Sequence, residues 1–96
     1  MPSKITTYTV TEDKVAQIEE AIEKFVRAIA ENEPQTYYAA YRTNDENTYF
    51  HIMRFPDTET EARHQKAPYT LEFVEVLYPN CIAAPKFTDL EMIEST

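Results

Sequence analysis

The spacing of hydrophobic positions changes along the chain, and the first two spacings predict a strand and a helix. Residues 4–10 (KITTYTV) are rich in β-branched side chains, as is typical of a strand. Thr11 is a good N-cap, and apolar residues then recur every three or four positions over Val15–Ile29. A helix is therefore expected to follow Thr11 and to end at Asn32 and Pro34.

Two aromatic-rich runs, residues 35–43 (QTYYAAYRT) and 48–55 (TYFHIMRF), predict a β-hairpin. A cluster of Asn and Asp lies between them in the sequence TNDENT. The chain contains no glycine, so a tight turn must use Asn or Asp, the other residue types that tolerate a positive φ. The two runs are therefore expected to pair as antiparallel strands around this turn.

The last part of the chain predicts two helical segments and a closing strand. Thr58 and Glu61 have the spacing of a capping box and open a short helix that Pro68 terminates. Residues 70–78 carry apolar side chains at helical spacing, and the sequence leaves open whether they extend one bent helix or form a second. Residues 86–93 (KFTDLEMI) alternate as a strand.

The order strand, helix, strand, strand, helix, strand is that of a ferredoxin-like βαββαβ sandwich, an α+β fold. A four-stranded antiparallel sheet then carries its helices on one face. The chain has 96 residues and is expected to form one domain over residues 1–96, because two domains of half this size would each lack an interior.

The predicted hairpin is apolar on both faces. In its first strand one parity carries Tyr37, Ala39 and Tyr41, whereas the other carries Tyr38 and Ala40. A sheet with one face in water alternates apolar with polar residues, so the second face is also expected to be covered. The expected cover is another copy of the chain, which gives a homodimer packed sheet to sheet.

Composition excludes several kinds of partner. The chain has 9 basic and 17 acidic residues, a net charge of -8, so no nucleic acid partner is expected. Without glycine, loops that cradle ATP, GTP, NAD or FAD are not expected either. No apolar run approaches the ~20 residues that span a bilayer, and the first residues lack the layout of a signal peptide, so a cytoplasmic protein without a membrane partner is predicted. The single Cys81 excludes an internal disulfide and a site of several thiolates.

The two histidines are the chain's candidate chemical groups. His64, on the short helix after Thr58, is the candidate general base for a phenolic or enolic hydroxyl. The alternative is a structural His64 that hydrogen-bonds a carbonyl or a carboxylate such as Glu61. His51 shares its strand parity with Met53 and is expected to face either a pocket or the subunit interface. No metal site is expected, because the two histidines have neither HxH nor HxxxH spacing.

Four aromatic residues are candidates for a substrate pocket: Tyr37, Tyr41, Tyr69 and Phe73. Together with His51 they would offer flat apolar walls and hydrogen-bonding groups to a hydroxylated ring. The alternative is that these aromatic residues belong to the core or to the subunit interface.

The run from Met53 through His64 to Pro68, Tyr69 and Phe73 resembles the antibiotic biosynthesis monooxygenase family. The resemblance implies a dimeric α/β barrel of two ferredoxin-like subunits, with a pocket in each subunit between the sheet and its helices. It implies cofactor-independent oxygenation of phenols or quinols, with His64 at the position of the family's helix histidine. The chain departs from the family at Met53, where Glu is common, and at Tyr69, where His is common. The family's haem-degrading branch is not indicated, since it places Trp where His64 stands and the chain has no Trp.

Three functions are consistent with the sequence. The first is a cofactor-independent monooxygenase that acts on a small aromatic or quinol substrate. The second is a non-catalytic domain that binds a small ligand in the same pocket. The third is a structural homodimer whose cleft is filled by aromatic side chains.

Overall fold

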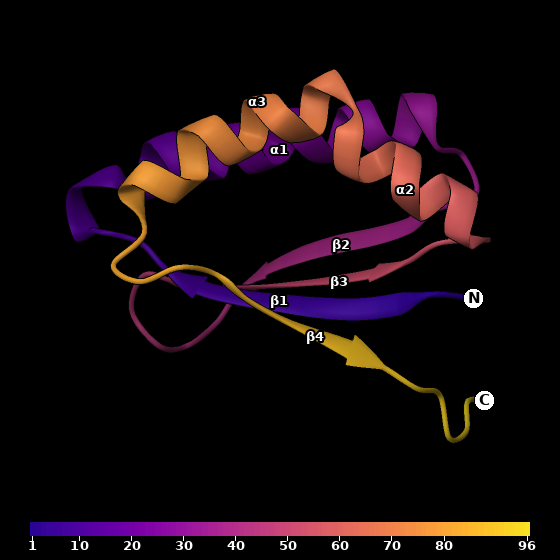
Figure 1. The fold of residues 1–96 in the computed structure, drawn as a ribbon. Coiled ribbons are helices and arrows are strands. Elements are labelled where there is room, and N and C mark those ends of the chain that lie inside the picture. The colour runs from indigo at the N-terminus through magenta and orange to yellow at the C-terminus, as the bar shows by residue number, and fades with distance from the viewer.

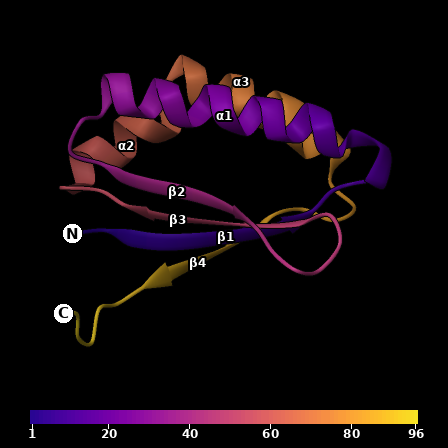
Figure 2. The ribbon, with the colours of Figure 1, turned by 180° about the vertical axis from the view of Figure 1, so that it is seen from behind.

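The computed structural model describes all 96 residues as three helices packed on one four-stranded sheet (Figure 1). A layer of helices covers one face of the sheet, and no helix covers the other face (Figure 2). The elements run in the order β1 (Ser3–Thr9), a 3-10 turn (Glu12–Lys14), α1 (Val15–Asn32), β2 (Tyr37–Arg42), β3 (Thr48–Arg54), α2 (Thr58–Lys66), α3 (Pro68–Leu77), a second 3-10 turn (Tyr78–Asn80) and β4 (Lys86–Leu90).

The sheet is antiparallel throughout and has the strand order β2-β3-β1-β4. The two central strands place Thr6 opposite His51, and β4 adds Phe87 opposite Thr6. This is the predicted α+β ferredoxin-like sandwich, with its helices on one face. The strand that follows α3 ends at Leu90 rather than at Ile93, so the predicted last strand was too long.

The core lies between the sheet and the pair α1 and α3, which pack side by side (Figures 1 and 2). Strand alternation places Tyr8 and Tyr49 on the face covered by the helices. Helical spacing places Ile18 and Phe25 of α1 against them, and the rings of Phe25 and Phe73 stack with their centroids 4.5 Å apart. The even parity of β1 and the odd parity of β3 are therefore the buried parities.

The first helix begins through a 3-10 turn. Thr11 is the N-cap of this turn, as predicted, but its side chain makes no hydrogen bond to the helix. Its backbone carbonyl instead accepts from the Lys14 N–H at 3.0 Å. At the other end Glu33 follows α1 directly, with its backbone N–H bonded to the Ile29 carbonyl and its side chain buried.

The hairpin turn lies where the Asn and Asp cluster predicted it. Asn47 has φ 60°, and no other residue has a positive φ. Asn tolerates this left-handed conformation because its short polar side chain hydrogen-bonds locally. The Thr43 N–H bonds the Thr48 carbonyl at 3.0 Å, which closes the turn.

Two separate helices lie between β3 and β4. The backbone at Ala67 is extended, with ψ 144°, and Pro68 then occupies the first turn of α3, where its missing N–H does no harm. The cap of α2 is Asp57, whose Oδ1 accepts from the Thr60 N–H at 2.7 Å. The predicted cap at Thr58 was therefore one residue too late.

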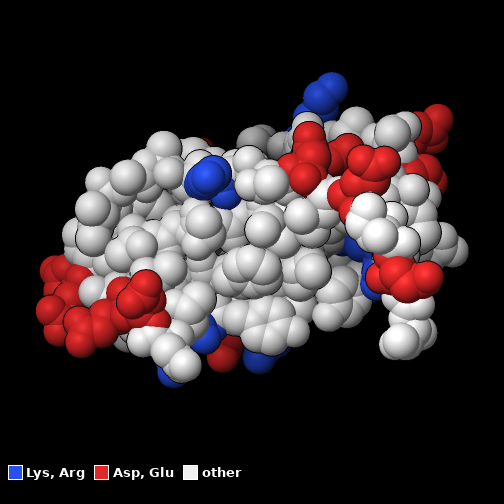
Figure 3. All heavy atoms as spheres, turned by 90° about the horizontal axis from the view of Figure 1, so that it is seen from below, with Lys and Arg blue, Asp and Glu red and all other residues white.

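The outer face of the sheet carries the remaining parity of each strand. Tyr37 and Tyr41 lie on this face, 46% and 53% exposed, and they pack against Arg54 and Phe50 of β3. Figure 3 shows this face with few charged atoms near its middle and with acidic residues toward its two ends. No helix of the structure is long and apolar enough to cross a membrane.

Candidate active site between the sheet and its helices

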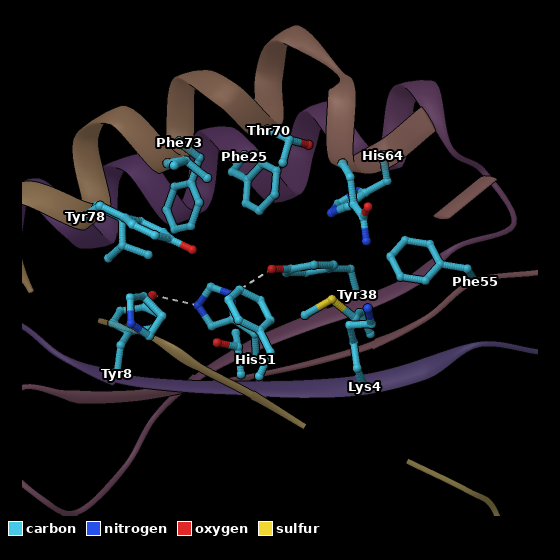
Figure 4. A pocket seen from close by; sticks show the side chains of 17 residues that line it. Lys4, Tyr8, Phe25, Tyr38, His51, Phe55, His64, Thr70, Phe73 and Tyr78 are labelled. Carbon is cyan, nitrogen blue, oxygen red and sulfur yellow. Dashed lines mark hydrogen bonds between the residues drawn. The ribbon is translucent and has the colours of Figure 1, made fainter. Parts of the chain in front are cut away.

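A cavity of about 310 Å³ lies between the helix-covered face of the sheet and the helices α2 and α3 (Figure 4). Its floor comes from β1, β2 and β3, and its roof comes from all three helices. Val74, Tyr78 and Phe87 line the side between α3 and β4, and Tyr78 and Phe87 are 42% and 54% exposed. That side is therefore the open one. The volume suits a ligand of one or two fused rings, since ligand pockets begin at roughly 300 Å³.

His64 projects from α2 into this cavity and is fixed by a carboxylate from another helix. Its Nδ1 lies 2.8 Å from Oε2 of Glu33, and both side chains are more than nine-tenths buried. The rings of Phe25 and Phe55 pack against the imidazole with centroids 5.7 Å and 5.0 Å away. Nε2 has no hydrogen-bond partner in the protein, so it is the ring atom that is free to meet a ligand.

Glu33 is itself held in place by two hydroxyl groups. The Tyr69 hydroxyl donates to the same Oε2 at 2.5 Å, and the Thr36 hydroxyl donates to Oε1 at 2.9 Å. Burial and this bond to Glu33 raise the pKa of Tyr69 to about 12, so Tyr69 stays a donor. A buried carboxylate with three hydrogen bonds fixes the tautomer of His64, with the proton on Nδ1 and the lone pair on Nε2.

The second histidine lies between two tyrosines on the floor of the cavity (Figure 4). The Tyr8 hydroxyl is 2.7 Å from Nε2 of His51, and the Tyr38 hydroxyl is 2.7 Å from Nδ1. Burial lowers the pKa of His51 to about 4, so the ring is neutral near pH 7. Burial also raises the pKa of both tyrosines above the ordinary range. The three side chains form an uncharged hydrogen-bonded chain.

An ion pair stands at the lip of the cavity. Nζ of Lys4, which also lines the cavity, is 2.7 Å from Oε2 of Glu61, and their side chains are 18% and 19% exposed. Glu61 is therefore paired with β1 and is not the partner of His64 that the sequence suggested. The carboxylate that fills that role is Glu33.

The structure brings together three of the six residues that the sequence selected for a site. His64, His51 and Phe73 line the cavity. Tyr69 does not line it, but its hydroxyl binds Glu33, the carboxylate that holds His64. Tyr37 and Tyr41 lie on the outer face of the sheet and take no part in this cavity, because their strand parity points away from the helices.

Tyr8, Tyr38 and Glu33, which contact the two histidines, were not selected from the sequence. Tyr8 and Tyr38 carried no distinguishing signal, because the strand parity that faces the helices is known only from the sheet pairing. Glu33 carried none, because it follows the helix in the segment ENEP and meets His64 only through the tertiary fold. No group of three or more His, Cys, Asp or Glu side chains is placed to hold a metal ion.

The family of the chain follows from its match to a family model. The model of antibiotic biosynthesis monooxygenases matches residues 1–76. The chain belongs to the antibiotic biosynthesis monooxygenase family. The resemblance of residues 53–73 to this family is thereby confirmed, and the matched range holds every residue of the Glu33–His64 and Tyr8–His51–Tyr38 contacts.

Solved structures of this family share the fold of the chain over nearly its whole length. A candidate antibiotic biosynthesis monooxygenase from Caulobacter crescentus has a TM-score of 0.89 at 20% identity, covering 97% of this chain and 90% of that one. A similar protein from Nitrosomonas europaea has a TM-score of 0.88 at 14% identity, with 98% and 100% covered. SnoaB from Streptomyces nogalater, described as a cofactor-independent oxygenase, has a TM-score of 0.80 at 17% identity, with 98% and 94% covered. None of the curated proteins matches the chain.

Proposed function

We propose that this member of the antibiotic biosynthesis monooxygenase family is a cofactor-independent monooxygenase for a small hydroxylated aromatic or quinol substrate. The observation that carries the proposal is the Glu33–His64 pair, a histidine whose free Nε2 faces a cavity while a buried carboxylate holds its other nitrogen. The description of SnoaB as a cofactor-independent oxygenase supports the same reaction class.

His64 acts as the general base. Nε2 takes the proton of the substrate hydroxyl, and Glu33 stabilises the imidazolium that forms because its carboxylate lies against Nδ1. The phenolate that remains is electron-rich enough to reduce dioxygen. The apolar walls around it exclude water from the reacting ring.

The reaction balances with dioxygen as the only oxidant. One oxygen atom bonds to the ring carbon opposite the hydroxyl and becomes a carbonyl oxygen. The other oxygen leaves as water with the ring hydrogen and the hydroxyl hydrogen. The substrate supplies the electrons, so 1-naphthol with O₂ gives 1,4-naphthoquinone and water.

The test is oxygen uptake by the purified protein with 1-naphthol and a panel of related hydroxyarenes and quinols. Uptake is expected to depend on the protein and to fall about 10²- to 10⁴-fold in His64→Ala, the range for loss of a general base. Circular dichroism confirms that the variant is folded. Equal uptake by the wild type and by His64→Ala would remove the base from the mechanism.

A ligand-binding domain without turnover is the second candidate, and the mostly apolar lining of the cavity favours it. It predicts saturable thermal stabilisation by the same compounds with no oxygen uptake above the spontaneous rate. Measuring both quantities on one panel separates the two functions.

We further propose that the chain works as a homodimer packed through the outer faces of its two sheets. Ile5, Ala39, Phe50 and Ile52 point to this face from three adjacent strands, and none of them is paired with a helix. An apolar sheet face of this extent is unusual on a monomer and is typical of an interface. The sparse charge at the middle of the face supports a second copy as the cover (Figure 3).

A further inference from the structure

The hydrogen-bonded group Tyr8–His51–Tyr38 has one more donor proton than its internal hydrogen bonds use. A neutral imidazole has one N–H and one bare nitrogen. One tyrosine hydroxyl therefore donates to the bare nitrogen, and the other accepts from the N–H. The accepting tyrosine keeps its own O–H proton, and neither hydroxyl has a further partner in the protein. If the ring were charged, both hydroxyl protons would be unused.

Two buried hydroxyl groups in the same cavity also have no partner. Thr6 is 4% exposed and Thr70 is 9% exposed, and both line the cavity. Oγ1 of each makes no hydrogen bond in the protein. Thr6 lies opposite His51 in the β1 and β3 pairing, on the floor of the cavity, and Thr70 lies on α3 above it (Figure 4). Buried polar groups rarely stay unpaired, so these hydroxyls indicate polar ligand atoms in the cavity.

From these contacts we infer that Tyr8, His51 and Tyr38 form a donor site for a carbonyl oxygen of the ligand, distinct from the base His64. The free tyrosine O–H donates to the carbonyl, and Thr6 and Thr70 lie in the same cavity as further donors. The inference rests on the proposed function in that it takes the same cavity as the ligand site. It adds that the ligand carries a ring ketone as well as the hydroxyl that His64 deprotonates.

The arrangement accounts for why the donor is a chain rather than a single hydroxyl. The protons can shift so that Tyr8 donates to Nε2 and Tyr38 faces the cavity, or so that Tyr38 donates to Nδ1 and Tyr8 faces it. Each state has the same net charge, and the imidazole changes only its tautomer. The site can therefore donate a hydrogen bond from either end without creating a buried charge.

The test compares two ligands that differ only in the ketone, 5-hydroxy-1-tetralone and 5,6,7,8-tetrahydro-1-naphthol. Their affinities are measured by calorimetry under nitrogen, so binding is recorded without oxygenation. The ketone is expected to bind the wild type about fivefold more tightly, the value of one net hydrogen bond. In the double variant Tyr8→Phe/Tyr38→Phe the preference for the ketone is expected to disappear. The affinity for 5,6,7,8-tetrahydro-1-naphthol is expected to stay the same.

Tyr49→Phe is the matched control. Tyr49 is also a buried tyrosine on the helix-covered face, but its hydroxyl donates to Glu19 at 2.8 Å and it does not line the cavity. This variant is expected to keep the preference for the ketone. An equal preference in the wild type and in the double variant, or no preference in the wild type, would overturn the inference.

A second measurement needs no variant and covers the case in which the double variant does not fold. In nitrogen-15 NMR spectra of the wild type, the signals of the His51 ring are expected to shift when 5-hydroxy-1-tetralone is added. They are expected to stay in place with 5,6,7,8-tetrahydro-1-naphthol. Unchanged His51 signals at saturating ketone would refute the donor site. A protein that binds the ketone in this way but takes up no oxygen would refute the proposed oxygenase activity and leave the donor site standing.

Discussion

Two histidines in one cavity have opposite surroundings, and this difference assigns their roles. His64 lies against the carboxylate of Glu33, whereas His51 lies between two phenols and burial lowers its pKa to about 4. Pairs of titratable groups with diverging environments are the usual sign of separate acid and base functions. At the scale of residues, the proposed base and the proposed donor site therefore involve different histidines.

The carboxylate of Glu33 is expected to matter for rate more than for folding. Glu33→Gln keeps an acceptor for the Nδ1–H of His64 but removes the charge that stabilises the imidazolium. Oxygen uptake is expected to fall about tenfold or more, yet by less than in His64→Ala. Glu61→Gln is the control, because it changes a carboxylate at the cavity lip that pairs with Lys4. Equal losses in the two glutamine variants would contradict the role of Glu33.

His51 is expected to make the stability of the protein depend on pH. Its pKa of about 4 lies below the ordinary value of 6.5, so between these values the unfolded chain binds a proton that the folded chain does not. The free energy of unfolding should fall by about 3 kcal/mol as the pH drops through this window, and His51 should add nothing further below it. Urea unfolding at several pH values measures this change.

His51→Gln is the control for that titration, since its amide can still bond Tyr8 and Tyr38 but does not ionise. The carboxylates of the chain contribute equally to both proteins. The wild type should therefore lose more stability than the variant between pH 6.5 and pH 4. Parallel pH curves for the two proteins would show that His51 is not held neutral by the fold.

At the scale of elements, local signals in the sequence determined most of the fold. Helical spacing predicted α1, β-branched and aromatic-rich runs predicted β1, β2 and β3, and alternation predicted β4. The Asn and Asp cluster located the turn at Asn47. What the sequence could not supply was contact between distant elements. Glu33 reaches His64 across 31 positions, and the strand parity that faces the helices became known only with the sheet pairing. For this reason Tyr37 and Tyr41 were selected and Tyr38 was not.

The start of α2 offers a test of capping. Asp57 accepts the Thr60 N–H, and hydrogen bonding to the side chain and the backbone of Thr60 holds the pKa of Asp57 below its usual range. Asp57→Ala is therefore expected to lower the melting temperature at pH 7 more than Thr58→Ala does. The difference should shrink as the pH falls and Asp57 becomes protonated, because a lowered pKa means that the stabilisation is present only above it. Thermal melts of both variants at two pH values measure this.

At the scale of the whole molecule, the two faces of the sheet have different tasks. The face under the helices holds the cavity, and the outer face is the proposed contact between subunits. The three helices also meet at one atom, since Oε2 of Glu33, the residue after α1, binds both His64 of α2 and Tyr69 of α3. Glu33 therefore links the end of α1 to both helices that flank the break at Ala67.

The dimer can be tested at the middle of the outer face. Ile52→Lys places a charge on β3 between Ile5 and Ala39, where a second sheet would have to bury it. Light scattering is expected to show a dimer for the wild type and a monomer for this variant. Leu71→Lys is the control, because Leu71 is 51% exposed on the helix layer, and this variant should stay dimeric. A wild type with the mass of one chain would refute the dimer.

The single positive φ, at Asn47, has a consequence for the unfolded chain. Glycine widens the range of conformations open to an unfolded polypeptide, and this chain has none. Only one residue of its native backbone has a left-handed conformation, and that residue is an Asn, which tolerates it. Less conformational entropy is therefore lost on folding than in a chain of equal length with the usual share of glycine. A fold with 16 buried residues therefore needs less burial to reach the same stability.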